Sequence, residues 1–286
     1  MKFKNICLIV LISSLLITTF FPNYASKANS DDEAKKIIEN KDGALALNYH
    51  RIRPTGIFEN FIMMFSNSKE LNTYSVTDKE FEKQIQWLKR HDANFLTLEE
   101  FINCKKKGKF PERAVFINFE DMDSTIKNEA EPILKKYDIP ATGFVITGKT
   151  GEEDYHNLDL LNKEELKDLK DTGRWSFGSL THNLHSNQDD RKKMLKKSNE
   201  EVTKDIKKSR KYLKEELGED NPVIAYPYGM INEDKVEAIE NSGMKYGFTL
   251  EDKPVTKKDS NYYIPRIVVS KDSFKRSISK WKGFKQ

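Results

Sequence analysis

The chain has 286 residues, of which 33% are charged, and its formal net charge is +4. Three lysines and no acidic residue fall within the first 28 positions, so the remainder carries 46 basic against 45 acidic residues. Most of these lysines alternate with glutamate and aspartate, which indicates a solvated surface and argues against a nucleic-acid-binding protein. The remaining length suffices for one large α/β domain.

The N-terminus has the three regions of a secretory signal. Two lysines precede an apolar run that ends at Phe21, and small residues follow from Ala25 to Ala28. A membrane anchor is the alternative, but polar pairs interrupt the run and it is short for a spanning helix. We therefore expect a secreted protein. Its expected parts are a signal peptide at 1–28, a flexible tether at 29–42 and a folded domain at 43–286.

Apolar runs typical of buried strands then alternate with segments of helical periodicity. The expected strands are Ala44–Tyr49, Ala114–Phe119, Thr142–Thr147, Val223–Tyr226, Tyr246–Leu250 and Ile264–Val269. Capping boxes at Thr77 and Thr97 predict two helix starts. Further helices are expected around Ala130–Leu134, Leu166–Leu169, Asn199–Leu217 and Val236–Ile239. This alternation predicts a parallel sheet with covering helices, which seven or eight units would close into a barrel.

Two adjacent carboxylates, Glu120 and Asp121, follow directly after the strand that ends at Phe119. One such group can bind a metal while the other accepts a proton, although a single acidic pair can also merely cap the end of a strand. Imidazoles that would complete a divalent-metal site come from His50, His182 and His185. Together these residues predict metal-assisted hydrolysis at the carboxyl ends of the strands.

Two other kinds of chemistry have no support in the sequence. It contains no Gly-rich phosphate loop and no Gly-x-Ser-x-Gly turn. The first absence argues against a nucleotide as ligand, and the second argues against a serine esterase.

Several longer segments resemble the polysaccharide deacetylases of carbohydrate esterase family four, which share the NodB homology. These segments are Leu45–Arg51, Lys135–Phe144, Ala225–Gly229 and Tyr263–Ile267. The resemblance covers nearly the whole chain after the leader, and it is greatest to the deacetylases of poly-β-1,6-N-acetyl-D-glucosamine. It implies a distorted (β/α) barrel that binds a divalent metal, of which zinc, cobalt and nickel are all plausible.

The resemblance also implies roles for individual residues. Asp121 and His185 would bind the metal, and Glu120 occupies the position of the general base. His50 would protonate the departing amine, and the backbone N–H of Tyr228 would stabilise the oxyanion.

Two positions depart from the family pattern. Glutamate replaces aspartate at position 120, which moves the carboxylate by roughly 1.5 Å, and misplacement of this order can cost about a hundredfold in rate. Leu180 occupies the position of a histidine ligand and has no lone pair to offer. Catalytic metals normally keep about three protein ligands, so a site made of Asp121 and His185 alone would be weak. His182 or a water would have to take the ligand position that Leu180 leaves without a donor. The alternative is that His182 is an exposed loop residue with no ligand role.

Three further side chains have two interpretations each. Arg266 would orient the base carboxylate or form a surface ion pair. Tyr226 and Trp175 would stack on sugar rings or be buried in the core.

Three functions follow for the whole chain. The first is a metal-dependent deacetylase of reduced efficiency, and the second is a degenerate relative that binds the polysaccharide without hydrolysing it. The third is an unrelated structural or adhesive role. The expected partners are the exopolysaccharide and the cell surface, to which the clusters Lys105–Lys107 and Lys192–Lys193 would be drawn unless they serve only solubility.

Overall fold

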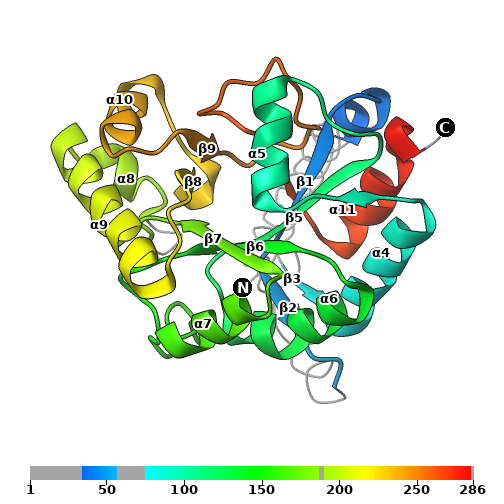
Figure 1. Cartoon of the computed structure of the whole chain (residues 1–286), viewed down its shortest axis with the longest axis horizontal. Helices are drawn as coiled ribbons and strands as arrows, with labels where there is room; N and C mark the ends of the chain where they lie inside the picture. Colours follow the sequence, from blue (N-terminus) through cyan, green and yellow to red (C-terminus); the bar gives the residue numbers. More distant parts are fainter. Residues whose placement is uncertain (1–33, 57–74, 187–189, 285–286) are drawn as a thin grey trace, which may run out of the picture.

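The computed structural model describes residues 34–56, 75–186 and 190–284 (Figure 1). The predicted signal peptide at 1–28 and the first part of the predicted tether, 29–33, lie outside the described residues.

One curled parallel sheet forms the centre of the molecule. Its strands run in the order β10-β1-β5-β6-β7-β8-β9, and β4 pairs with β5 as well. Their bounds are β1 Ala44–Tyr49, β4 Asn94–Phe95, β5 Ala114–Phe119, β6 Ala141–Val145, β7 Trp175–Ser179, β8 Val223–Ala225, β9 Tyr246–Phe248 and β10 Ile267–Val268. A separate parallel pair consists of β2 Arg51–Arg53 and β3 Ser75–Thr77.

The segment that leads into β10 joins the two ends of this sheet. Thr249 N, just after β9, donates to Ile264 O at 2.8 Å, and Val269 N, just after β10, donates to Asn48 O of β1 at 2.9 Å. The strands therefore close into a distorted ring, as expected for a (β/α) barrel, although the predicted strand Ile264–Val269 is regular only over β10.

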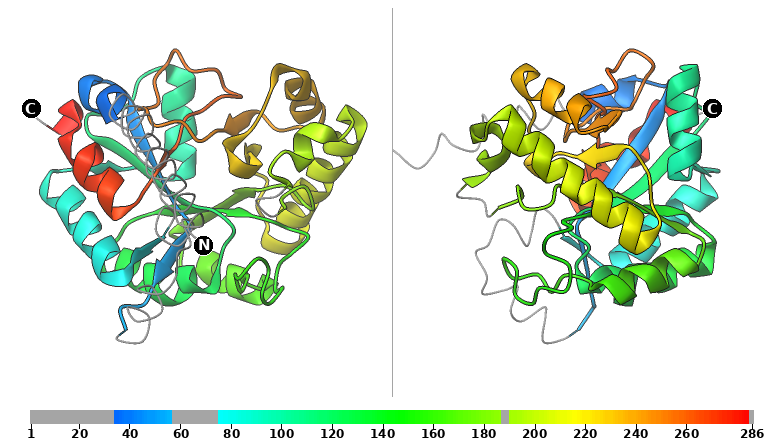
Figure 2. Two further views of the ribbon diagram at one scale, coloured as in Figure 1. Left: turned by 180° about the vertical axis from the view of Figure 1, so that it is seen from behind. Right: turned by 60° about the vertical axis from the view of Figure 1, so that its left-hand side comes forward.

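Helices surround the sheet, as Figures 1 and 2 show. Their bounds are α4 Asp78–Arg90, α5 Leu98–Lys107, α6 Glu131–Tyr137, α7 Lys163–Asp171, α8 Lys193–Lys196, α9 Asn199–Leu217, α10 Glu233–Asn241 and α11 Lys271–Arg276. A π-helical turn, η1 Ile126–Ala130, precedes α6, and short 3-10 turns occur at η3 Pro227–Gly229, η4 Ile278–Lys280 and η5 Lys282–Phe284. Within the described ranges, no helix combines the length and the apolar character needed to cross a membrane.

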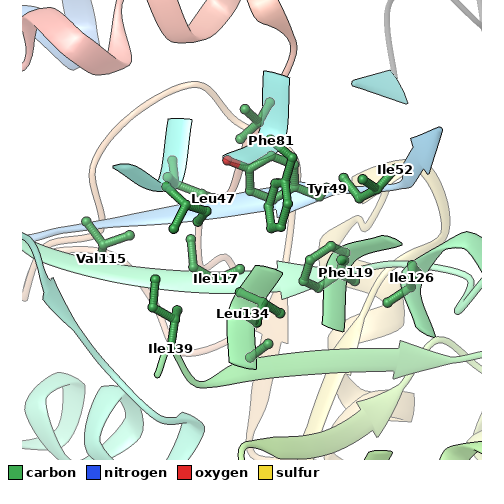
Figure 3. Close-up of a cluster of buried hydrophobic side chains, with 14 of the residues drawn as sticks. Leu47, Tyr49, Ile52, Phe81, Val115, Ile117, Phe119, Ile126, Leu134 and Ile139 are labelled. Carbon is green, nitrogen blue, oxygen red and sulfur yellow. The ribbon is translucent and has the colours of Figure 1, made fainter. Parts of the chain in front are cut away.

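Strand alternation divides the apolar residues between two faces of the sheet. The outer face packs against α4, α6 and α11. Together they form an outer cluster, part of which Figure 3 shows. The sheet contributes Leu45, Leu47, Val115, Ile117 and Phe119, and the helices contribute Phe81, Leu134 and Phe274. The inner face carries Ala44, Ala46, Phe116, Phe144 and Phe248 and packs against α5, where Phe101 stacks on Phe116 with ring centroids 4.5 Å apart. Even-numbered residues of β1 and β5 therefore point inward.

Local signals in the sequence predicted the helix starts correctly. Thr77 and Thr97 both form complete capping boxes, with Glu80 and Glu100 respectively. The prediction of a flexible tether is wrong for its second part, because residues 34–39 form a helix. Ile37 is 1% exposed within the outer cluster. No periodicity marks this short helix; contacts with distant residues hold it.

Candidate active site

The inner face changes from apolar to polar at the carboxyl ends of β1 and β5. After Ala44 and Ala46, the same alternation brings Asn48 and then His50 inward, and β5 repeats this pattern with Asn118 and Glu120. Asn48 pairs in register with Asn118, so the two strands end side by side. Two layers of polar side chains, Asn48 with Asn118 and His50 with Glu120, therefore follow the apolar layers of the barrel interior.

Arg266 connects these layers. Its guanidinium donates to Asn48 Oδ1 and Asn118 Oδ1, both at 3.2 Å, and to Glu120 Oε1. The side chain is 0% exposed, so it is not a surface ion pair, and it cannot contact a glycan directly as a substrate-binding residue would. Its position matches the other interpretation, in which it orients the carboxylate at position 120.

His50 and Glu120 form an ion pair at this polar end, with His50 Nε2 at 3.1 Å from Glu120 Oε2. Burial would raise the pKa of Glu120, but the Arg266 charge and the His50 hydrogen bond hold that pKa well below its usual range. Burial would lower the pKa of His50, but Glu120 outweighs it and raises that pKa. The two shifts favour the ionised form of Glu120 and the protonated form of His50.

Asp121 and His185 form a second pair. Asp121 Oδ1 lies 3.7 Å from His185 Nε2, which is beyond hydrogen-bond distance. Asp121 Oδ1 and His185 Nδ1 are buried and have no hydrogen-bond partner among the described residues. Burial raises the pKa of Asp121, and the charges of His185 and His50 oppose that rise. A buried carboxylate oxygen without a partner that faces an imidazole nitrogen offers two donors to one metal ion.

The third ligand position does not supply a donor. Leu180 follows β7 directly, is 0% exposed, and packs in the inner apolar cluster. His182 is turned elsewhere, since its Nδ1 lies 3.1 Å from Thr147 Oγ1. Across the described residues, no group of three or more His, Cys, Asp or Glu side chains is arranged to hold a metal ion. These residues therefore do not fit the three-ligand site that the resemblance implies.

The tyrosines of the Tyr226-Pro227-Tyr228-Gly229 turn have different environments. Tyr226 is fully buried and its hydroxyl donates to Tyr262 O, so the sugar-stacking role is wrong for it. Tyr228 has a positive φ of 55° and stacks on His185, with ring centroids 5.2 Å apart. Tyr228 thus lies beside the pair formed by Asp121 and His185.

Trp175 belongs to the core. Its side chain is 3% exposed and its indole N–H donates to Glu131 Oε2 at 2.6 Å. The core interpretation was the correct one for this residue.

Sequence reasoning missed several residues that hold the site. Asn48 and Asn118 have a usable signal, because each lies two positions before a candidate catalytic residue on the same strand face. Asp205 of α9 accepts from the backbone N–H groups of His182 and Asn183. It has no such signal, since it stands in a charged helix with many acidic and basic neighbours.

Comparisons with known proteins identify the family of the chain. The family model for "Polysaccharide deacetylase" matches residues 107–247. The chain is 49% identical over 286 residues to poly-beta-1,6-N-acetyl-D-glucosamine N-deacetylase of Staphylococcus aureus (strain N315), with 99% of each chain covered. It is 50% identical over 280 residues to the enzyme of the same name from Staphylococcus epidermidis, covering 96% of this chain and 97% of that one.

Solved structures show a similar fold. Streptococcus pyogenes deacetylase PplD in complex with acetate has a TM-score of 0.68 and 25% identity, covering 83% of this chain and 99% of that chain. IcaB from Ammonifex degensii has a TM-score of 0.68 and 24% identity, covering 85% and 97% respectively, and supports the fold alone.

Proposed function

The chain belongs to the polysaccharide deacetylase family, and we propose that it removes N-acetyl groups from poly-β-1,6-N-acetyl-D-glucosamine. The observation that carries this proposal is 49% identity, over 99% of each chain, to a relative named for that reaction. The polar end of the barrel supports it, since it brings two carboxylates and two imidazoles together where barrel enzymes have their active sites.

Hydrolysis adds a water molecule to the acetamide carbonyl and gives acetate and a free amine, and three residues of this chain would assist it. His50, whose pKa is raised by Glu120, would give its proton to the departing amine nitrogen. The backbone N–H of Tyr228 would stabilise the oxyanion that develops on the carbonyl oxygen. Glu120 would keep the imidazole of His50 oriented and charged through the 3.1 Å contact. Because the metal ligands are incomplete, we assign no step to a metal ion.

A second function is favoured by a specific observation. Leu180 stands at a ligand position, while the rest of the barrel and its polar network are intact. A chain of this kind could bind the acetylated polymer without hydrolysing it. Binding of the glycan that persists in a chelator, without acetate release, would select this function.

Acetate release from β-1,6-linked N-acetylglucosamine oligomers tests the first function. We expect the native chain to release acetate, and we expect Asp121→Ala to abolish the release because the Asp121 charge helps to raise the pKa of His50, the proposed proton donor. β-1,4-linked oligomers of the same length serve as the control substrate. Equal release by the native chain and by Asp121→Ala would rule out this site as the source of the activity.

We also propose that the protein is exported and acts at the cell surface. The signal-like first 28 residues support export. Each acetyl group removed would leave an amine on the polymer, and the resulting positive charge would favour retention on an anionic surface. Cell fractionation with an antibody against the folded domain tests this, and a cytoplasmic location would contradict it.

A further inference from the structure

The residues around position 180 decide whether the site can hold a divalent metal ion. This inference rests on the proposed function. Asp121 and His185 remain in place as two potential ligands, with Asp121 Oδ1 at 3.7 Å from His185 Nε2. Among the described residues, the buried Asp121 Oδ1 has no hydrogen-bond partner. Two donors of this kind are one fewer than a catalytic divalent metal normally takes from the protein.

Position 180 itself faces the interior of the barrel. β7 ends at Ser179, and Leu180 N donates to Val145 O of the neighbouring strand β6 at 2.8 Å. Trp175 and Phe177 belong to the outer cluster, whereas Leu180 belongs to the inner one, so its side chain points to the same face as His50 and Glu120. Position 180 therefore lies on the inner face, directly after β7, with a side chain that offers no donor.

His182 cannot compensate without local rearrangement. Thr147 Oγ1 contacts its ring at 3.1 Å, and Asp205 accepts from its backbone N–H at 2.8 Å. Its carbonyl accepts from Gly148 N at 3.0 Å. Turning the ring toward Asp121 would break the Thr147 contact, and moving the backbone would break the other two.

Both carboxylate oxygens of Glu120 also have partners. Its Oε2 contacts His50 and its Oε1 accepts from Arg266, which Asn48 and Asn118 hold in turn. Because each carboxylate oxygen already contacts a basic side chain, Glu120 cannot supply the missing ligand without breaking one of these contacts.

We propose that Leu180 and Glu120 together have replaced the metal centre of this family by a cluster of side chains that pair with one another: Leu180 offers no ligand, and Glu120 pairs with His50 and Arg266. The native chain then holds no catalytic divalent ion, and the hydrolytic step is limited for that reason. The missing donor concerns one side chain, so Leu180→His would complete a ligand set that Asp121 and His185 already begin.

Equilibrium dialysis with Zn²⁺ tests the inference on the full chain after its leader. We expect the native protein to bind no more zinc than Asp121→Ala binds. We expect Leu180→His to bind one equivalent, at least roughly 10–100-fold more tightly than the native chain, since losing even an outer-shell partner has an effect of this size. Leu180→Asn, which adds polarity at similar volume without an imidazole, should stay at the native level, and Leu180→His/Asp121→Ala should lose the gained affinity.

One equivalent of zinc bound tightly by the native protein and released by Asp121→Ala would overturn the inference. So would a Leu180→His variant that folds by circular dichroism and binds no better than Leu180→Asn. Should Leu180→His fail to fold, the native and Asp121→Ala measurements still decide the question.

Two further assays separate this inference from the substrate proposal. Acetate release by Leu180→His and by Leu180→His/Glu120→Asp should exceed native release on the β-1,6-linked oligomers. If zinc affinity is gained while neither variant binds or hydrolyses these oligomers, the proposed substrate is wrong and the inference about the metal stands.

Discussion

The side chain at position 120 determines how the charged groups of the site are paired. Glu120 is 3% exposed and contacts both His50 and Arg266. Replacing a buried ion pair as a whole can be neutral, but removing one partner leaves a charge that neither water nor a counter-ion stabilises. Arg266 therefore matters for folding as well as for the orientation of the carboxylate.

We expect Arg266→Met to lower the free energy of unfolding by about 3–5 kcal/mol, because the buried Glu120 carboxylate loses one of its two basic partners. Urea unfolding followed by circular dichroism measures the change. The double variant Arg266→Met/Glu120→Gln should lose less than the single one, since no buried charge remains unpaired. An unchanged midpoint for Arg266→Met would contradict the role of this ion pair in stability.

Helix starts in this protein are specified by short local patterns. α4, α5, α7 and α9 each begin with a capping box, in which two orphan backbone N–H groups are satisfied by side chains. In α9, Glu201 accepts from Ser198 N at 2.9 Å and pairs with Lys197 at 2.9 Å. This helix also carries Asp205, which holds the backbone of His182, so its N-terminal turn supports the site.

The start of α9 should respond to acid. The Lys197 and Ser198 hydrogen bonds lower the pKa of Glu201 from 4.5 to about 2. The ionised form therefore stabilises the folded state above pH 4.5, and this contribution is lost as the pH falls toward 2. Unfolding midpoints of the native chain and Glu201→Gln should differ near neutral pH and converge in that acidic range. A constant difference at every pH would contradict the assignment.

The whole molecule is held together by contacts between the two ends of the described chain. β10 lies beside β1, and Arg266 contacts Asn48 although the two residues are 218 positions apart. Trp281 donates its indole N–H to the Asn40 carbonyl, just after the helix at 34–39. The N-terminal helix is therefore part of the folded domain.

We expect Ile37→Ala to destabilise the domain by about 2–5 kcal/mol, as for other buried aliphatic residues cut back to alanine. Thermal or urea unfolding measures the loss. Lys36→Ala, one position away and exposed, should stay within about 0.5 kcal/mol of the native chain. Equal effects of the two substitutions would mean that residues 34–39 do not stabilise the domain.

Local chemistry alone predicted a large part of the fold. β1 and β5 have the predicted bounds, as does α9, and the capping boxes at Thr77 and Thr97 form as expected. These features depend on residues a few positions apart, which the sequence displays directly. Period-two alternation also places His50 and Glu120 on one face once the two strands are paired.

Only the tertiary structure decided the rest. Arg266 is buried rather than exposed because Asn48, Asn118 and Glu120, all distant in sequence, converge on it. His182 faces Thr147 because Asp205 of α9 holds its backbone. Long-range contacts of this kind follow from how strands and helices assemble, and no local pattern encodes them. The sequence alone showed that Leu180 offers no ligand; the fold showed that its neighbours do not replace it.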